Sequence, residues 1–104
     1  MKLKSVANAE NAGLVEYHFF CPGCNRVHRI PVSGASFNWK FDNNFEKPSF
    51  HPSLKITYDY LKVDEAHTFC CHSIIAGGNI KFCADSTHEL GGKTVPMPDW
   101  PYDE

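Results

Sequence analysis

Short runs of large apolar residues, several of them alternating with polar ones, recur along this 104-residue chain. β-Branched and aromatic residues dominate these runs, and a two-residue alternation is typical of half-buried strands. Clusters rich in glycine, proline, asparagine or aspartate separate the runs and predict turns. We therefore expect a mainly β, antiparallel domain. The runs that predict strands are residues 14–20, 26–32, 36–41, 54–63, 68–76 and 80–84.

The clearest local prediction is a hairpin. Gly77-Gly78-Asn79 separates residues 68–76 from residues 80–84, and a glycine pair favours the tight turns that join antiparallel strands. The pattern then changes, because Ser86-Thr87-His88-Glu89 has the S-x-x-E spacing of a helix capping box and Gly91-Gly92 ends the segment. One short helical turn is expected there.

The length of the chain predicts one domain, spanning residues 1–104. Its hydrophobic fraction of 42% argues against a disordered chain, which could not bury enough apolar surface to fold. Residues 1–12 are interpreted as a loose lead-in or an edge element. Residues 93–104 contain three prolines and are expected to form an extended tail.

Charge and cysteine content narrow the class of protein. The net charge is −2 and no block of lysine or arginine occurs, which argues against a nucleic-acid-binding surface. No apolar run approaches the roughly 20 residues that span a bilayer. Residues 1–10 lack the apolar segment of a secretory signal, so we expect a cytoplasmic protein. Five cysteines in that setting are expected to be reduced thiols or metal ligands.

Cys21-Pro-Gly-Cys24 is the most informative motif. It lies between two predicted strands, and two thiolates spaced C-x2-C on a turn supply half of a tetrahedral zinc site. A zinc ion would stabilise a small core, because metal binding then contributes to the free energy of folding. Two further ligands must come from elsewhere in the chain.

Several distant residues are candidates to complete this site. Neighbours in a strand point to opposite faces, so Cys70 and His72 can bind one ion together, whereas Cys71 shares its face with apolar residues. A cysteine in apolar company is commonly a small buried hydrophobe. His88 lies on the predicted capped turn, from which it can point inward, although it can also be an ordinary surface histidine. The full set of candidates is His28, His51, Cys70, Cys71, His72, Cys83 and His88.

The segment from Asp85 to Glu89 also carries the groups that a hydrolase uses. Ser86 is a candidate nucleophile, with backbone N–H groups beside it, but a serine at this position is also the usual helix N-cap. Ser53 has the same two interpretations. If His72 points away from the metal, its imidazole becomes the base that a serine nucleophile requires. A zinc-bound water with Glu89 as base is a second scheme, for which His-Glu alone gives little support.

Taken together, the motifs resemble a family of small phage and bacterial proteins of unknown function, often mislabelled as ammonia monooxygenases. The resemblance covers about residues 17–100. Some relatives lie in operons for ubiquitin-like conjugation, where a peptidase role has been proposed. The matching motifs are F-x-C-P-G-C at residues 19–24, Trp39, K-P-S-F-x-P-S at 47–53, C-H-S at 71–73, I-x-F-x-x-D-S-T-H-E-L at 80–90 and G-x-T-V-x-x-P at 92–98.

This resemblance changes the expected metal ligands. Cys71 falls at the cysteine of the family pattern, whereas Cys70, Cys83 and His51 are additional. The resemblance therefore implies Cys71 as the third ligand, against the geometric preference for Cys70. The position of Ser86 resembles one that relatives fill with serine or cysteine, and the operon context implies a peptidase.

We therefore expect a Zn²⁺ site built by Cys21, Cys24, Cys71 and His88. The first functional hypothesis is a hydrolase, most simply a peptidase acting on a protein or a ubiquitin-like tail, with Ser86 as nucleophile, His72 as base and Asp85 orienting the base. The alternative is a non-enzymatic phage or accessory protein whose structural zinc builds a protein-interaction surface. Either hypothesis implies a protein partner, and the oligomeric state stays open.

Overall fold

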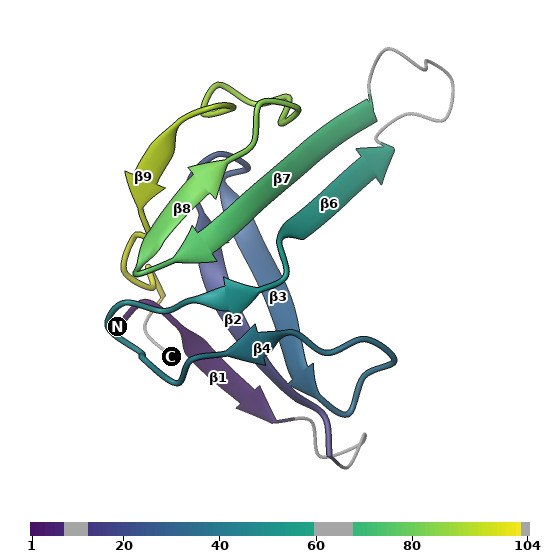
Figure 1. Ribbon diagram of the computed structural model, residues 1–104, viewed down its shortest axis with the longest axis vertical. Helices are drawn as coiled ribbons and strands as arrows, with labels where there is room; N and C mark the ends of the chain where they lie inside the picture. The colour runs from purple at the N-terminus through teal and green to yellow at the C-terminus, as the bar shows by residue number, and fades with distance from the viewer. Residues whose placement is uncertain (8–12, 60–67, 103–104) are drawn as a thin grey trace.

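The computed structural model describes residues 1–7, 13–59 and 68–102, and these residues form nine strands and no helix (Figure 1). No segment within these ranges is therefore a helix able to cross a membrane. The expectation of a mainly β, antiparallel domain is confirmed. The strands are β1 (Lys4–Ala7), β2 (Val15–Cys21), β3 (Arg26–Ser33), β4 (Lys40–Phe41), β5 (Phe50–His51), β6 (Leu54–Asp59), β7 (Thr68–Ala76), β8 (Asn79–Phe82) and β9 (Thr94–Pro96).

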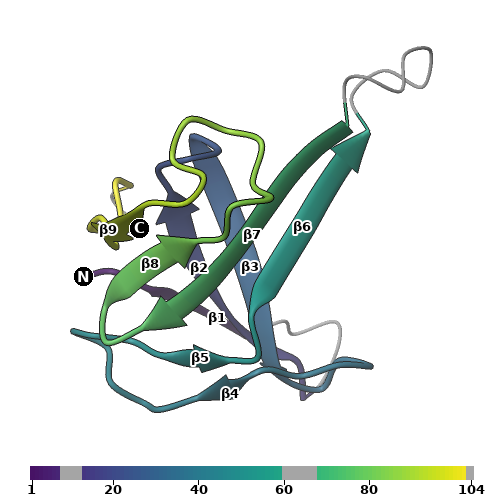
Figure 2. The ribbon, with the colours of Figure 1, turned by 45° about the horizontal axis from the view of Figure 1, so that its top comes forward.

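The strands form three antiparallel sheets, with the orders β1-β2-β3, β4-β5 and β6-β7-β8-β9. Figure 2 shows β7 crossing in front of β2 and β3. Alternate residues of the two larger sheets are buried between them, as in β8, where Ile80 and Phe82 are buried and Asn79 and Lys81 are exposed. One core results, made of Leu3, Phe19, Cys21, Ile30, Phe50, Leu54, Cys71, Ile75, Ile80, Phe82 and Met97.

The predicted hairpin is confirmed as β7, a two-residue turn and β8. Gly77 and Gly78 have φ values of 58° and 82°, and such a pair of positive φ values matches the right-handed twist of the strands it joins. The expected helical turn is absent from the described chain. Residues 88–92 form successive turns instead, in which the Gly91 N–H donates to the His88 carbonyl oxygen at 3.1 Å.

The other predicted strands agree in place but differ in length. Of residues 36–41, only Lys40–Phe41 form a strand. The run expected over residues 54–63 is a strand up to Asp59, and its remainder lies outside the described residues. Residues 4–7 form an edge strand on β2, and residues 94–96 pair with β8.

Candidate functional site: the two faces of strand β7

Strand β7 positions two clusters of reactive side chains, because successive residues of a strand point to opposite faces. Cys71, Ser73 and Ile75 face the core and are at most 2% exposed. His72 points the other way, and its side chain is 26% exposed. The register with β6 pairs Lys55 with His72. We call these the inner and outer faces of β7.

The inner face carries the four residues expected as metal ligands. Cys21 and Cys24 come from the connection between β2 and β3, Cys71 from β7 and His88 from the turns after β8. One ligand atom from each residue lies within 4.8 Å of the others. Three segments far apart in the sequence therefore meet at one cluster.

Local backbone geometry explains why this turn presents its two thiols together. Asn25 has a φ of 56°, and its N–H donates to the Cys21 carbonyl oxygen at 2.8 Å, which closes the turn. Gly23 lies directly under His88: a Cβ on this glycine would sit 2.3–2.7 Å from atoms of the imidazole ring. A side chain at position 23 would therefore push His88 out of the cluster.

The three thiols strongly perturb one another. Hydrogen bonds from Cys24 and Cys71 hold the pKa of the Cys21 thiol far below its usual range. The hydrogen bond with Cys21 raises the pKa of Cys24 to about 12. Hydrogen bonds with Cys21 and Cys24 raise the pKa of Cys71 well above its usual value. The three thiols therefore compete for deprotonation, because a negative charge on one disfavours a charge on its neighbours. A divalent cation among them favours deprotonation of all three, because it compensates the charge.

His88 supplies a second indication that the cluster suits a metal ion. Its Nε2 atom is buried without a hydrogen-bond partner, which costs free energy that a bound cation would recover. The rings of Phe82 and His88 make an edge-to-face contact, with centroids 4.6 Å apart, and the Leu90 N–H donates to Nδ1 at 3.2 Å. A metal on Nε2 would require the ring proton on Nδ1, so this contact with Leu90 should lengthen on metal binding. The set of three sulfurs and one imidazole is a common one for zinc.

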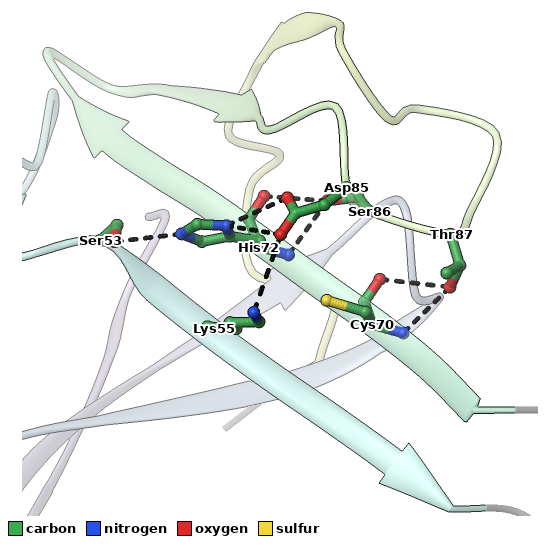
Figure 3. Close-up of polar contacts among 7 residues, drawn as sticks. All are labelled: Ser53, Lys55, Cys70, His72, Asp85, Ser86 and Thr87. Carbon is green, nitrogen blue, oxygen red and sulfur yellow. Dashed lines mark hydrogen bonds and ion pairs between the residues drawn. The ribbon is translucent and has the colours of Figure 1, made fainter.

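The outer face carries a chain of hydrogen bonds from a serine through a histidine to an aspartate (Figure 3). The Ser53 Oγ atom lies 3.2 Å from Nε2 of His72. Nδ1 of His72 lies 3.1 Å from both carboxylate oxygens of Asp85. Because the carboxylate can only accept, it favours the tautomer with a proton on Nδ1, which leaves Nε2 to accept the hydroxyl proton of Ser53.

Each member of this chain comes from a different element. Ser53 immediately precedes β6, His72 lies in β7, and Asp85 follows β8. The indole N–H of Trp39 donates to the Ser53 carbonyl oxygen at 3.4 Å and so contacts the segment that carries the hydroxyl. Nζ of Lys55 lies 3.8 Å from Asp85, in an ion pair in which both side chains are at least half exposed.

Ser86 contacts His72 through the backbone and not through the imidazole. Its Oγ atom donates to the His72 carbonyl oxygen at 2.9 Å and accepts from the His72 N–H at 3.0 Å. Thr87 makes the equivalent pair of hydrogen bonds with the backbone of Cys70. These side chains extend the pairing along β7 beyond the end of β8. Of the three residues expected as catalytic, the structure joins His72 and Asp85 by their side chains and leaves the Ser86 hydroxyl bonded to backbone.

From its sequence context alone, Ser53 has two interpretations, as a nucleophile or as a capping residue. The K-P-S-F-H-P-S motif contains Ser53, but the motif does not reveal which histidine side chain lies beside the hydroxyl group. Other candidates lie outside the inner cluster: Cys70 is not in it, the His51 side chain is exposed, and His28 is buried in edge-to-face contact with Phe19.

A serine hydroxyl, an imidazole and a carboxylate bonded in this order form the arrangement that serine hydrolases use, on many unrelated folds. The comparison with known families agrees with this class. The family model described as bacterial ubiquitination-like system serine protease (BubE) matches residues 2–83, and the chain belongs to this family. The match contains Ser53 and His72 and ends before Asp85 and His88. No curated protein and no solved structure matches the chain.

Proposed function

We propose that this protein is a serine peptidase of a bacterial ubiquitination-like system, with Ser53 as nucleophile, His72 as general base and Asp85 orienting the base. The observation that carries the proposal is the continuous chain of hydrogen bonds from Ser53 Oγ through His72 to Asp85, at 3.2 and 3.1 Å. The proposal moves the nucleophile from Ser86 to Ser53. Ser86 becomes a positioning residue that holds the backbone of His72.

The geometry supports the usual steps of acyl transfer. Nε2 of His72 takes the proton of Ser53 as Oγ attacks the scissile carbonyl, and Asp85 stabilises the imidazolium that forms. His72 then gives that proton to the leaving amine, which leaves an acyl group on Ser53. A water molecule activated by the same imidazole hydrolyses the acyl-enzyme and returns Ser53 to its starting state.

The surroundings of Ser53 favour an extended polypeptide as substrate. Ser53 is followed directly by β6, which pairs with β7 on one side and is an edge of its sheet among the described residues. A substrate segment that adds to this edge would run past Ser53 with its backbone hydrogen-bonded, as in other cases of strand addition. The family description leads us to a ubiquitin-like protein or its extended tail as the substrate class.

For the inner cluster we propose a structural Zn²⁺ bound by Cys21, Cys24, Cys71 and His88. Three thiolates and one imidazole fit zinc, and four protein ligands leave no open position for a reacting water. The ion would join the β2–β3 connection, β7 and the turns after β8, which are the elements behind the outer face. It takes no part in the steps at Ser53.

Active-site labelling tests the nucleophile without knowledge of the natural substrate. The purified protein is incubated with a fluorophosphonate probe, and the modified residue is located by peptide mass spectrometry. We expect modification of Ser53 that is lost in Ser53→Ala and His72→Ala. The matched controls are Ser86→Ala and Ser36→Ala, the latter at an exposed serine, which should both remain modified. Modification of Ser86, or labelling that survives Ser53→Ala, would contradict the assignment.

Cleavage tests the substrate class. A ubiquitin-like protein from such a bacterial system, carrying a C-terminal extension, is incubated with the enzyme and its intact mass is followed. Ser53→Ala should lower the cleavage rate by about 10⁴-fold or more. Equal cleavage by wild type and Ser53→Ala would exclude Ser53 as nucleophile. No cleavage by the folded, metal-loaded wild type would instead favour the non-enzymatic accessory protein.

A further inference from the structure

Cys83 lies beside the proposed catalytic residues but has no place in their chemistry. It directly follows β8, its side chain is half-buried, and its N–H donates to the His72 carbonyl oxygen at 2.7 Å. Its sulfur, one imidazole nitrogen of His72 and one carboxylate oxygen of Asp85 all lie within 4.8 Å of one another. The outer face therefore holds a thiol, an imidazole and a carboxylate that converge on one point.

We propose that His72, Cys83 and Asp85 form a second, reversible Zn²⁺ site, and that an ion bound there switches off Ser53. The inhibition rests on the proposed function, whereas the binding of the ion does not. A regulatory metal site would thus share two residues with the catalytic triad, on the face of β7 opposite to the structural cluster.

The ligand set and its spacing suit zinc. Zinc is a borderline ion that accepts nitrogen, sulfur and oxygen donors together, and a water molecule would take the fourth position. Bond lengths of about 2.0–2.3 Å in a tetrahedron separate ligand atoms by about 3.3–3.8 Å. The ligand atoms lie within 4.8 Å of one another, and Nδ1 of His72 is 3.1 Å from Asp85. Any pair therefore needs to approach by at most about 1.5 Å, which the half-exposed side chain of Asp85 allows.

This site should bind more weakly than the inner cluster. It offers three protein ligands in place of four, and only one of them is a thiolate. The ammonium group of Lys55 lies 3.8 Å from Asp85 and repels a cation bound to that carboxylate. A weaker site next to a tight one is the arrangement expected of a reversible inhibitor beside a permanent structural ion.

Zinc would inhibit by changing which nitrogen of the His72 imidazole carries the proton. In the active arrangement Nδ1 carries the proton and Nε2 accepts from Ser53. Nδ1 is the ring nitrogen next to Asp85, so a zinc ion shared with this carboxylate would take the lone pair of Nδ1. The ring proton then resides on Nε2, and the proton of the Cys83 thiol passes to solvent. An Nε2–H group cannot accept the proton of Ser53, so attack stops until the ion leaves.

Zinc stoichiometry tests the site without any assay of activity. Native mass spectrometry of the zinc-loaded full-length protein is carried out over a zinc titration for wild type, Cys83→Ser and the control Cys70→Ser, which changes a half-buried cysteine outside the cluster. We expect wild type and Cys70→Ser to bind one zinc more than Cys83→Ser, with the affinity for that ion reduced by about tenfold or more when the thiol is lost. Asp85→Asn is a second variant that should weaken the same ion. Equal zinc uptake by wild type, Cys83→Ser and Asp85→Asn would overturn the proposal.

Activity then tests the consequence. Added zinc should inhibit cleavage by wild type and Cys70→Ser, and Cys83→Ser should need about tenfold more zinc for the same inhibition. Acceleration by zinc would overturn the inhibitory role, because the ion would then act in catalysis. A protein with no peptidase activity contradicts the proposed function, and in that case the stoichiometry alone decides whether the second site exists.

Discussion

The two faces of β7 differ in burial, in chemistry and in how strongly the stability of the fold should depend on them. On the inner face, Cys71 is 1% exposed and joins a compact cluster of thiols. On the outer face, His72 is partly exposed and joins a linear chain of hydrogen bonds. If the buried cluster binds a metal ion, loss of any ligand should weaken the fold, because metal binding then contributes to the free energy of folding. A half-exposed chain of polar groups can lose a member and leave the fold intact.

The segment after β8 links the two faces. Asp85 and Ser86 contact His72 on the outer face, and His88, three residues beyond Asp85, joins the inner cluster. A metal ion that fixes His88 would therefore also fix the carboxylate that orients the imidazole. Loss of a residue of the inner cluster should therefore disturb both faces of β7. Loss of a residue on the outer face should leave the inner cluster intact.

Loss of a thiol ligand should have the largest effect. Cys24→Ser is expected to abolish metal binding and to unfold or aggregate the protein. Structural zinc contributes about 10–16 kcal/mol in small domains, which matches or exceeds a whole domain's stability of about 5–15 kcal/mol. The measurements are zinc per chain by elemental mass spectrometry and thermal unfolding by circular dichroism.

Cys70→Ser is the matched control, since Cys70 lies one residue from Cys71 but outside the cluster. It should keep one tightly bound metal ion per chain and a melting temperature close to that of wild type. A folded Cys24→Ser variant with its metal intact would refute the role of the inner cluster. Metal removal from wild type with a strong chelator should reproduce the loss of Cys24→Ser and abolish fluorophosphonate labelling of Ser53 as well.

Asp85→Asn should have the next largest effect, confined to the outer face. An amide can present its NH2 group to Nδ1 and so favour the wrong tautomer, which in serine-protease triads costs about 10⁴-fold in kcat. We expect a comparable loss of cleavage, with the tightly bound zinc of the inner cluster and the melting temperature unchanged. A stability loss as large as that of Cys24→Ser would show that the outer face also supports the fold, and would contradict the expected difference between the two faces.

The sequence predicted what is local and missed what depends on long-range register. Alternating residues located the strands, and the C-x2-C spacing located half of the inner cluster. The third cysteine of the inner cluster was predicted from the family resemblance, because geometry alone preferred Cys70 over Cys71. Ser53 was left open because its contact with His72 depends on how β6 pairs with β7, across 19 positions of the chain.

The Ser86 segment illustrates a second limit. Its S-x-x-E spacing predicts a helix cap, in which the serine oxygen accepts from backbone N–H groups one turn ahead. In the structure the same oxygen bonds to the backbone of His72, so a neighbouring strand supplies the partner that the helix would have supplied. A serine hydroxyl can form a hydrogen bond with any backbone group within reach, and the sequence pattern does not identify that group.

Ser86→Ala should have a moderate effect. It removes the acceptor of the His72 N–H, while the His72 carbonyl keeps the bond from Cys83 at 2.7 Å. Leaving a donor unsatisfied costs about 1–3 kcal/mol, which should lower the melting temperature by several degrees. Cleavage should fall but persist, because the side chains of Ser53, His72 and Asp85 remain. Complete loss of cleavage in a folded Ser86→Ala variant would return the nucleophile to Ser86.

Lys55→Met should have the smallest effect, and it tests whether the charge beside Asp85 matters. The ion pair spans 3.8 Å between side chains that are 56% and 50% exposed, and pairs of this kind contribute about 0–1 kcal/mol because water and salt screen them. We expect unchanged content of the tightly bound metal, a melting temperature close to that of wild type and a change in kcat/KM of less than about fivefold that shrinks as ionic strength rises. The comparison needs kcat/KM for both proteins at low and high salt. A much larger loss that persists at high salt would mean that Lys55 contacts the substrate directly, since screening removes a long-range charge effect but leaves a buried contact in place.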